Sequence, residues 1–259
     1  MNRMERILGE MKQEGKKILV NYFPLCDTLL EDQVAWAGRY FENGVTVLEM
    51  GLPYEDPCLD GKTVRDSMAR ALAKYTVEDA FTVIRSLRDA YADNILQVMT
   101  YFEIIDRMGV ECFAEKCEKS GADAVLCPNV PRDRLAELDA ALQKRGLLNL
   151  RFSPYYLTDE AVADLKTNAK GYIFQQAVDG GTGMQKTVSP QVSVNVKALK
   201  AEGIATPVLA GFGISNGAQA KEACDMGADG VIVGSAVITA IQNGEGEAFI
   251  ASLRKGLDQ

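Results

Sequence analysis

The feature that most constrains this chain is a regular alternation of short β-branched apolar runs with amphipathic helical patterns. Short apolar runs rich in valine and isoleucine are typical of buried strands, whereas apolar residues three or four positions apart indicate helices. Eight runs are predicted strands: 17–22, 45–50, 95–100, 123–127, 148–152, 171–175, 207–210 and 230–234. Helical spacing occupies windows between and after them: 32–43, 77–91, 110–119, 132–144, 159–168, 191–202, 216–226 and 245–255. Strict alternation implies parallel strands joined by helical crossovers.

A weak internal repeat supports one βα unit used many times. Residues 41–51, 119–129 and 225–235 each run from a helix end through a glycine turn into an apolar strand. Glycine suits the left-handed position that ends a helix. A doubly wound open sheet could use the same unit, but eight units in 259 residues match a closed α/β barrel of about 250 residues. We therefore expect a single (β/α)₈ barrel domain over residues 1–259.

The charge balance and the apolar segments limit the partners. The formal net charge of −8 argues against nucleic acid, because phosphate backbones are bound by clustered lysine and arginine. The N-terminal residues 1–17 alternate charged and apolar side chains, unlike the apolar centre of a signal peptide. No stretch approaches the roughly 18 apolar residues of a transmembrane helix. We expect no membrane association and a cytoplasmic location.

The chain has no histidine and six scattered cysteines. A zinc site needs clustered ligands, which this spacing does not offer, so we expect no metal and buried, free thiols. The absence of histidine also excludes Ser-His and Cys-His nucleophile pairs. Acid–base chemistry must then come from carboxylates, lysines, tyrosines or cysteines. The cysteines are Cys26, Cys58, Cys112, Cys117, Cys127 and Cys224.

Glu49 is the first candidate for that chemistry, because it stands near the end of the predicted strand 45–50. Active sites of parallel barrels form at the carboxyl ends of the strands. Alternation puts Glu49 on the same face as Val45 and Val47, without fixing which face is inside. A glutamate facing the barrel interior would have a raised pKa, as a general acid–base requires. Facing outward, it would be a solvated strand-end residue.

The loop after this strand, residues 51–63, is the second candidate. It carries three acids, two prolines and two glycines, and it is longer than the usual connection of about two to six residues. Long, rigid loops at this end of a barrel often carry function. Asp60 lies close enough in sequence to face Glu49 across a pocket, although Asp60-Gly61 is also an ordinary turn pair.

Two glycine loops near the end of the chain predict a phosphate site. Residues 211–215 and 234–236 follow consecutive predicted strands and lead into helices. Glycine lets backbone N–H groups approach an anion, and a helix N-terminus adds positive partial charge. Simple turns are the alternative. The glycine-rich segment 178–187 is expected to be a mobile loop that closes over substrate.

Taken together, these segments resemble the tryptophan synthase alpha chain over nearly the whole length. The resemblance is strongest at LEMGLPYEDPCLDG (48–61), residues 99–131, GGTG (180–183), AGFGIS (210–215) and GADGVIVGSAV (227–237). It implies a TIM barrel that cleaves indole-3-glycerol phosphate by a retro-aldol reaction into indole and glyceraldehyde 3-phosphate, without a cofactor. It also implies an α2β2 assembly, in which a beta chain carrying pyridoxal phosphate receives the indole.

The resemblance also assigns roles. Glu49 would move a proton between the substrate hydroxyl and the indole C3, and Asp60 would stabilise positive charge on the ring nitrogen. Thr182 would pair with Asp60. The phosphate would rest on Gly183, Phe212, Gly213, Gly234 and Ser235. Two carboxylates, a phosphate site and a lid are together consistent with a cofactor-free lyase.

Several positions depart from the family pattern. Residues 25–28 read Leu-Cys-Asp-Thr, and 178–183 lack the family's arginine. Phe174 replaces an aromatic hydroxyl that is expected beside the catalytic glutamate. The loops at 55–57 and 101–104 are also altered. Two alternatives therefore stay open: a family member that cleaves the same or a related phosphorylated substrate without a beta chain, and a catalytically weak regulatory paralogue.

Overall fold

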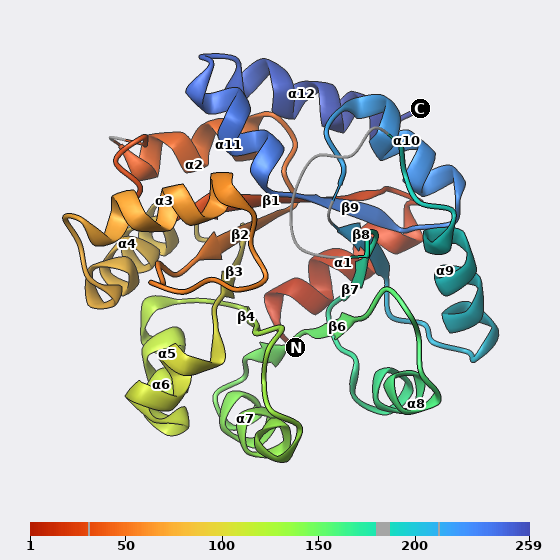
Figure 1. Ribbon diagram of the computed structural model, residues 1–259, viewed down its shortest axis with the longest axis horizontal. Helices are drawn as coiled ribbons and strands as arrows, with labels where there is room; N and C mark the ends of the chain where they lie inside the picture. The colour runs from red at the N-terminus through yellow and green to blue at the C-terminus, as the bar shows by residue number, and fades with distance from the viewer. Residues whose placement is uncertain (31, 180–186, 212) are drawn as a thin grey trace.

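The computed structural model describes residues 1–30, 32–179, 187–211 and 213–259. Its strands form one parallel sheet at the centre, and the helices surround it (Figure 1). The order in the sheet is β5-β4-β3-β2-β1-β9-β8-β7-β6. The strands are β1 (Ile18–Pro24), β2 (Val47–Gly51), β3 (Ile95–Met99), β4 (Ala124–Leu126), β5 (Leu148–Asn149), β6 (Arg151–Ser153), β7 (Ile173–Gln176), β8 (Val208–Gly211) and β9 (Gly230–Val233).

The two ends of this order, β5 and β6, are halves of one stretch of chain. The predicted strand 148–152 is interrupted at Leu150, whose N–H donates to the Val125 carbonyl at 2.8 Å. The first half pairs with β4, and the second half pairs with β7. The chain itself therefore joins the two edges, and the sheet closes into the predicted (β/α)₈ barrel.

Helices cover the outside of the barrel, as parallel strands require. Their bounds are α1 (Arg3–Gln13), α2 (Gln33–Glu42), α3 (Lys62–Leu72), α4 (Val77–Ala90), α5 (Phe102–Met108), α6 (Val110–Ser120), α7 (Arg132–Lys144), α8 (Asp159–Asn168), α9 (Gln191–Ala201), α10 (Gly217–Asp225), α11 (Ser235–Gln242) and α12 (Gly246–Leu257). Local signals fix several starts: Thr76 and Asp79, for instance, form a capping box at α4. Helices α1, α3, α5 and α11 lie outside the windows of helical spacing predicted from the sequence.

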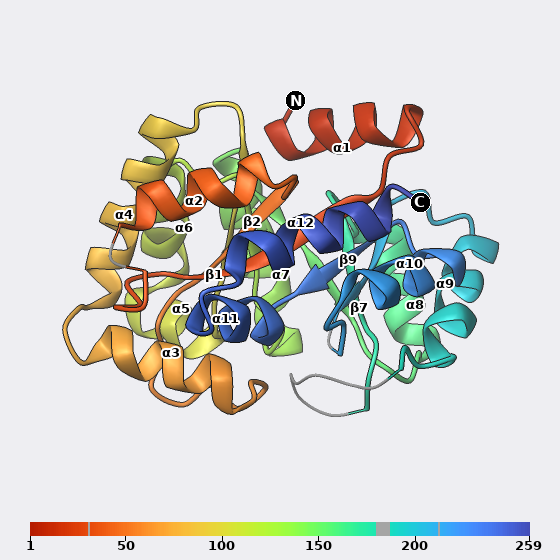
Figure 2. The same ribbon diagram turned by 90° about the horizontal axis from the view of Figure 1, so that it is seen from above.

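Helix α1 lies across the amino-terminal end of the barrel, away from the ends where a site is expected (Figure 2). Its Met4 and Leu8 pack with the apolar side chains inside the barrel. Asp123, which is buried, pairs with Arg3 of α1 and with Arg88 of α4. This ionic cluster holds α1 in place and leaves the opposite end open.

Strand β2 shows which side chains face inward. Leu48 and Met50 belong to the core between the sheet and the helices, whereas Glu49 faces the interior. The register places Glu49 between Tyr22 of β1 and Gln97 of β3. Side-chain alternation could not say whether Glu49 faces the barrel interior or the solvent; the structure shows that it faces the interior.

The cysteines only partly follow the prediction. All six are free, but Cys58 and Cys112 are exposed and Cys224 is partly exposed. The prediction of buried thiols was wrong for these three, because their positions fall on a loop and on outer helix faces. Within the described ranges, no helix is both long and apolar enough to cross a membrane.

Candidate active site

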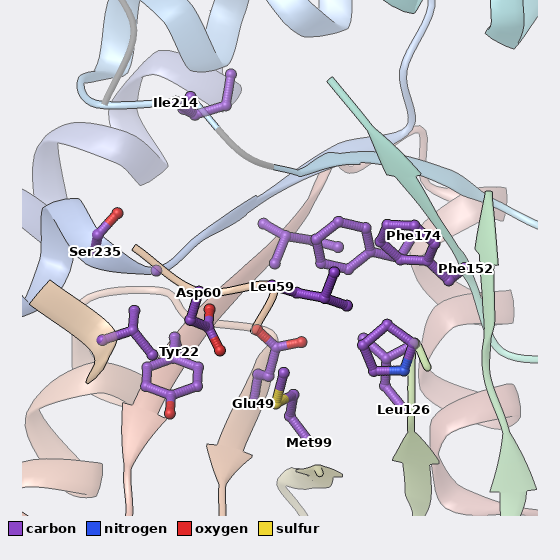
Figure 3. Close-up of a pocket in the computed structure, with 15 residues that line it drawn as sticks. Tyr22, Glu49, Leu59, Asp60, Met99, Leu126, Phe152, Phe174, Ile214 and Ser235 are labelled. Atoms are coloured by element: carbon purple, nitrogen blue, oxygen red, sulfur yellow. The ribbon is translucent and has the colours of Figure 1, made fainter. Parts of the chain in front are cut away.

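A pocket opens at the carboxyl ends of the strands, the end predicted for the site. It encloses about 630 Å³ of space, part of which is open to solvent. Glu49 and Asp60 both point into it, with Phe152 and Phe174 on another wall (Figure 3). The lining residues are Tyr22, Glu49, Leu59, Asp60, Val64, Met99, Leu126, Pro128, Phe152, Phe174, Gly213, Ile214, Ile232, Gly234 and Ser235. Most are apolar, so an aromatic or aliphatic group fits among them.

Glu49 has the properties of a general acid–base. Only 4% of its surface is exposed. The pKa of Glu49 is raised from 4.5 to about 7: burial is the largest cause, a hydrogen bond from Gln97 acts to lower the pKa, and the neighbouring Asp60 acts to raise it. A carboxyl with a pKa near neutrality can both give and accept a proton at physiological pH.

A network of buried hydrogen bonds reaches the Glu49 carboxyl. The Gln97 Nε2 donates to Glu49 Oε1 at 3.1 Å, and the Tyr172 hydroxyl donates to Gln97 Oε1. Phe174 lies in the pocket wall and packs against Phe152, with the ring centroids 5.2 Å apart. Phe174 has no hydroxyl to donate to Glu49, but Gln97 supplies a hydrogen-bond donor to that carboxyl instead.

Asp60 stands at the end of the loop after β2, directly before α3. It is buried, and its Oδ2 accepts a hydrogen bond from the Tyr101 hydroxyl at 2.7 Å. Tyr101 comes from the loop after β3. The structure places Asp60 and Glu49 in the same pocket.

Aromatic and ionic contacts hold the loop that carries Asp60. Tyr54 stacks on Tyr101 with the ring centroids 5.3 Å apart, and the Arg107 guanidinium lies over the Tyr54 ring. Arg107 also pairs with Glu55. These contacts connect the loop after β2 to α5. Tyr101, which stacks on Tyr54, also donates a hydrogen bond to Asp60.

Three of the predicted phosphate residues line the same pocket: Gly213, Gly234 and Ser235. Gly213 has φ +85°, a conformation that favours glycine. Helix α11 begins at Ser235 without a side-chain cap, so its first N–H groups can bind an anion. The other two predicted phosphate residues, Gly183 and Phe212, lie outside the described residues, as does Thr182, which was predicted to pair with Asp60.

Three polar residues around the carboxylates were not predicted from the sequence: Tyr22, Gln97 and Tyr101. Their signal was available in part, because a glutamine and tyrosines interrupt otherwise apolar strand segments. The Tyr22 hydroxyl is buried and has no hydrogen-bond partner in the described part of the chain. Burial, followed by the charges of Asp60 and Glu49, raises its pKa well above the usual value, so Tyr22 stays protonated beside both carboxylates.

A (β/α)₈ barrel with two buried carboxylates in an apolar pocket at its strand ends defines a class: barrel enzymes that work by acid–base chemistry. Residues 8–255 match the family model described as tryptophan synthase alpha chain. The chain belongs to the tryptophan synthase alpha chain family.

Individual relatives agree with that membership. The tryptophan synthase alpha chain of Archaeoglobus fulgidus is 34% identical, over 92% of this chain and 98% of the relative. That of Vibrio parahaemolyticus is 32% identical, over 93% and 90%. Among solved structures, Mycobacterium tuberculosis tryptophan synthase superposes with a TM-score of 0.89 at 26% identity, covering 100% of this chain and 99% of the other. The alpha subunit from Legionella pneumophila gives 0.88 at 26% identity, with the same coverage.

Proposed function

We propose that this chain cleaves indole-3-glycerol phosphate to indole and glyceraldehyde 3-phosphate as the alpha subunit of a tryptophan synthase. The observation that carries the proposal is Glu49, a buried carboxyl with a pKa of about 7 in an apolar pocket beside Asp60. Family membership supplies the reaction class. The six free cysteines are typical of a reducing compartment, and we place the reaction in the cytoplasm.

In the proposed mechanism, the protonated Glu49 carboxyl gives its proton to C3 of the indole ring. Positive charge then develops at the ring nitrogen, where the Asp60 carboxylate accepts the N–H and stabilises the charge. The Glu49 carboxylate next takes the proton of the substrate hydroxyl as the C–C bond breaks. The bonding pair returns to the ring, the hydroxyl carbon becomes the aldehyde, and Glu49 is protonated again.

The phosphate of the substrate has a separate proposed site in the same pocket. We propose that the N–H groups at the start of α11, at Gly234 and Ser235, bind it together with Gly213. Phe212 and Gly183 are proposed to complete this site, and Thr182 to pair with Asp60. A phosphate held here places the glycerol chain between the anion site and Glu49.

The test is an assay of indole release from indole-3-glycerol phosphate by the purified chain, alone and with a tryptophan synthase beta chain. We expect cleavage that a beta chain stimulates, together with an α2β2 complex in gel filtration. Glu49→Gln should abolish turnover and leave phosphate binding intact. An active Glu49→Gln variant would refute the assigned role.

A second candidate is the same cleavage without a beta chain. The observation that favours it is that contacts within this chain already hold the loop after β2: the Tyr101 hydroxyl donates to Asp60, and Arg107 pairs with Glu55. Full activity without stimulation, and no complex in gel filtration, would decide for this candidate.

A further inference from the structure

Gln97 is a polar residue in the barrel interior, beside Glu49 of the neighbouring strand. It is fully buried, and the interior also holds a cluster of apolar side chains from β1, β2 and β9. An amide buried among such side chains is costly unless its polar atoms are hydrogen bonded. Both ends of this amide have a partner, and one of the partners is the Glu49 carboxyl.

The two partners fix which way the amide points. The Tyr172 hydroxyl donates to Gln97 Oε1, so the carbonyl end is taken and the NH₂ end faces Glu49 Oε1 at 3.1 Å. Tyr172 is also fully buried, and it precedes β7, which lies across the barrel from β3. The Tyr172 side chain therefore crosses the barrel interior, and its hydrogen bond fixes the orientation of the Gln97 amide.

We propose that Gln97, locked by Tyr172, is the positioning residue that orients the Glu49 carboxyl for proton transfer. Gln97 does not line the cavity, so it acts on substrate only through Glu49. An amide NH₂ donates to a protonated carboxyl and to an ionised one alike, and it does not itself take the proton. Glu49 can thus keep one orientation through both halves of a proton shuttle. Phe174, which does line the pocket, carries no group that could do this.

The inference deepens the proposed function and rests on it. Gln97→Met keeps the unbranched shape and removes the donor. We expect kcat to fall by about 10- to 100-fold, with KM within about threefold, since a misdirected acid–base loses much of its contribution. The pH inflection assigned to Glu49 should move upward by about one pH unit, because the donor favours the ionised form. Tyr172→Phe keeps the ring and should shift both quantities in the same direction by less.

Gln175→Met is the matched control. Gln175 is an equally buried glutamine on β7, but its amide bonds to Ser153 and to the Pro154 carbonyl, not to Glu49. Its loss should leave the inflection in place even where stability falls. A folded Gln97→Met variant with wild-type kcat and an unmoved inflection would overturn the inference. If that variant does not fold, an unmoved inflection in Tyr172→Phe overturns it.

A second readout separates this inference from the proposed function. Absence of turnover in the wild type contradicts the function alone, and the role of Gln97 is then tested on the ligand-free chain by urea unfolding. Gln97→Met should lose more stability at pH 8 than at pH 5, and this difference should vanish in a Glu49→Gln background. An equal loss at both pH values would overturn the role of Gln97.

Discussion

Replacing Glu49 with glutamine should destroy activity and at the same time stabilise the folded chain, in a way that depends on pH. Burial raises the pKa of Glu49 from 4.5 to about 7. Well below pH 4.5, the carboxyl is protonated in both the folded and the unfolded chain, so Glu49 ionisation does not change the free energy of unfolding. As pH rises towards 7, the unfolded chain ionises first, so unfolding becomes more favourable. At about 1.4 kcal/mol per pH unit, the folded state loses about 3 kcal/mol by pH 8.

Glutamine does not titrate, so the Glu49→Gln variant does not lose this stability as pH rises. Equilibrium urea unfolding followed by circular dichroism should find the variant more stable than the wild type at pH 8. Its advantage should be about 2–3 kcal/mol smaller at pH 5. Glu42→Gln, at an exposed position near the end of α2, is the control and should change stability by less than about 0.5 kcal/mol at both pH values. An advantage of Glu49→Gln that is the same at pH 5 and pH 8 would refute the reasoning.

Three further substitutions test other parts of the structure. Asp60→Asn should lower kcat/KM for indole release by about 100-fold or more, because it removes the charge that we propose stabilises the ring nitrogen; activity near the wild-type level would contradict that role. Tyr22→Phe should stabilise the ligand-free chain by about 1 kcal/mol in thermal unfolding, since it removes a buried hydroxyl without a partner among the described residues; a clear loss of stability would show that the hydroxyl is paired. Gly256→Ala should cost about 2 kcal/mol or more, because a Cβ there would lie 2.1 Å from the Gly217 carbonyl oxygen where α12 crosses α10; unchanged urea unfolding would show that the crossing can relax.

Local sequence patterns were enough for the architecture. β-Branched runs, helical spacing and glycine turns predicted eight βα units, and the barrel confirms them. Such patterns work because strand and helix periodicities are local properties of the chain. The interruption at Leu150 was not predicted, because it arises where one strand pairs with different neighbours along its length.

The two carboxylates were also predictable, because a site in a parallel barrel lies where strands end. Their environment was not. Gln97 is 48 residues from Glu49 and Tyr172 is 75 residues from Gln97, so no sequence window contains the network that they form. Only the register between β2 and β3 and the closure of the barrel bring these side chains together.

The sequence by itself determined the barrel, the candidate acid–base group Glu49 and its partner Asp60. The tertiary structure decided that Glu49 faces inward, that burial brings its pKa near neutrality, and that an amide supports it where Phe174 offers no hydroxyl. The reason is physical: side-chain alternation is written along one strand, whereas desolvation and hydrogen bonding depend on the strands that close around it.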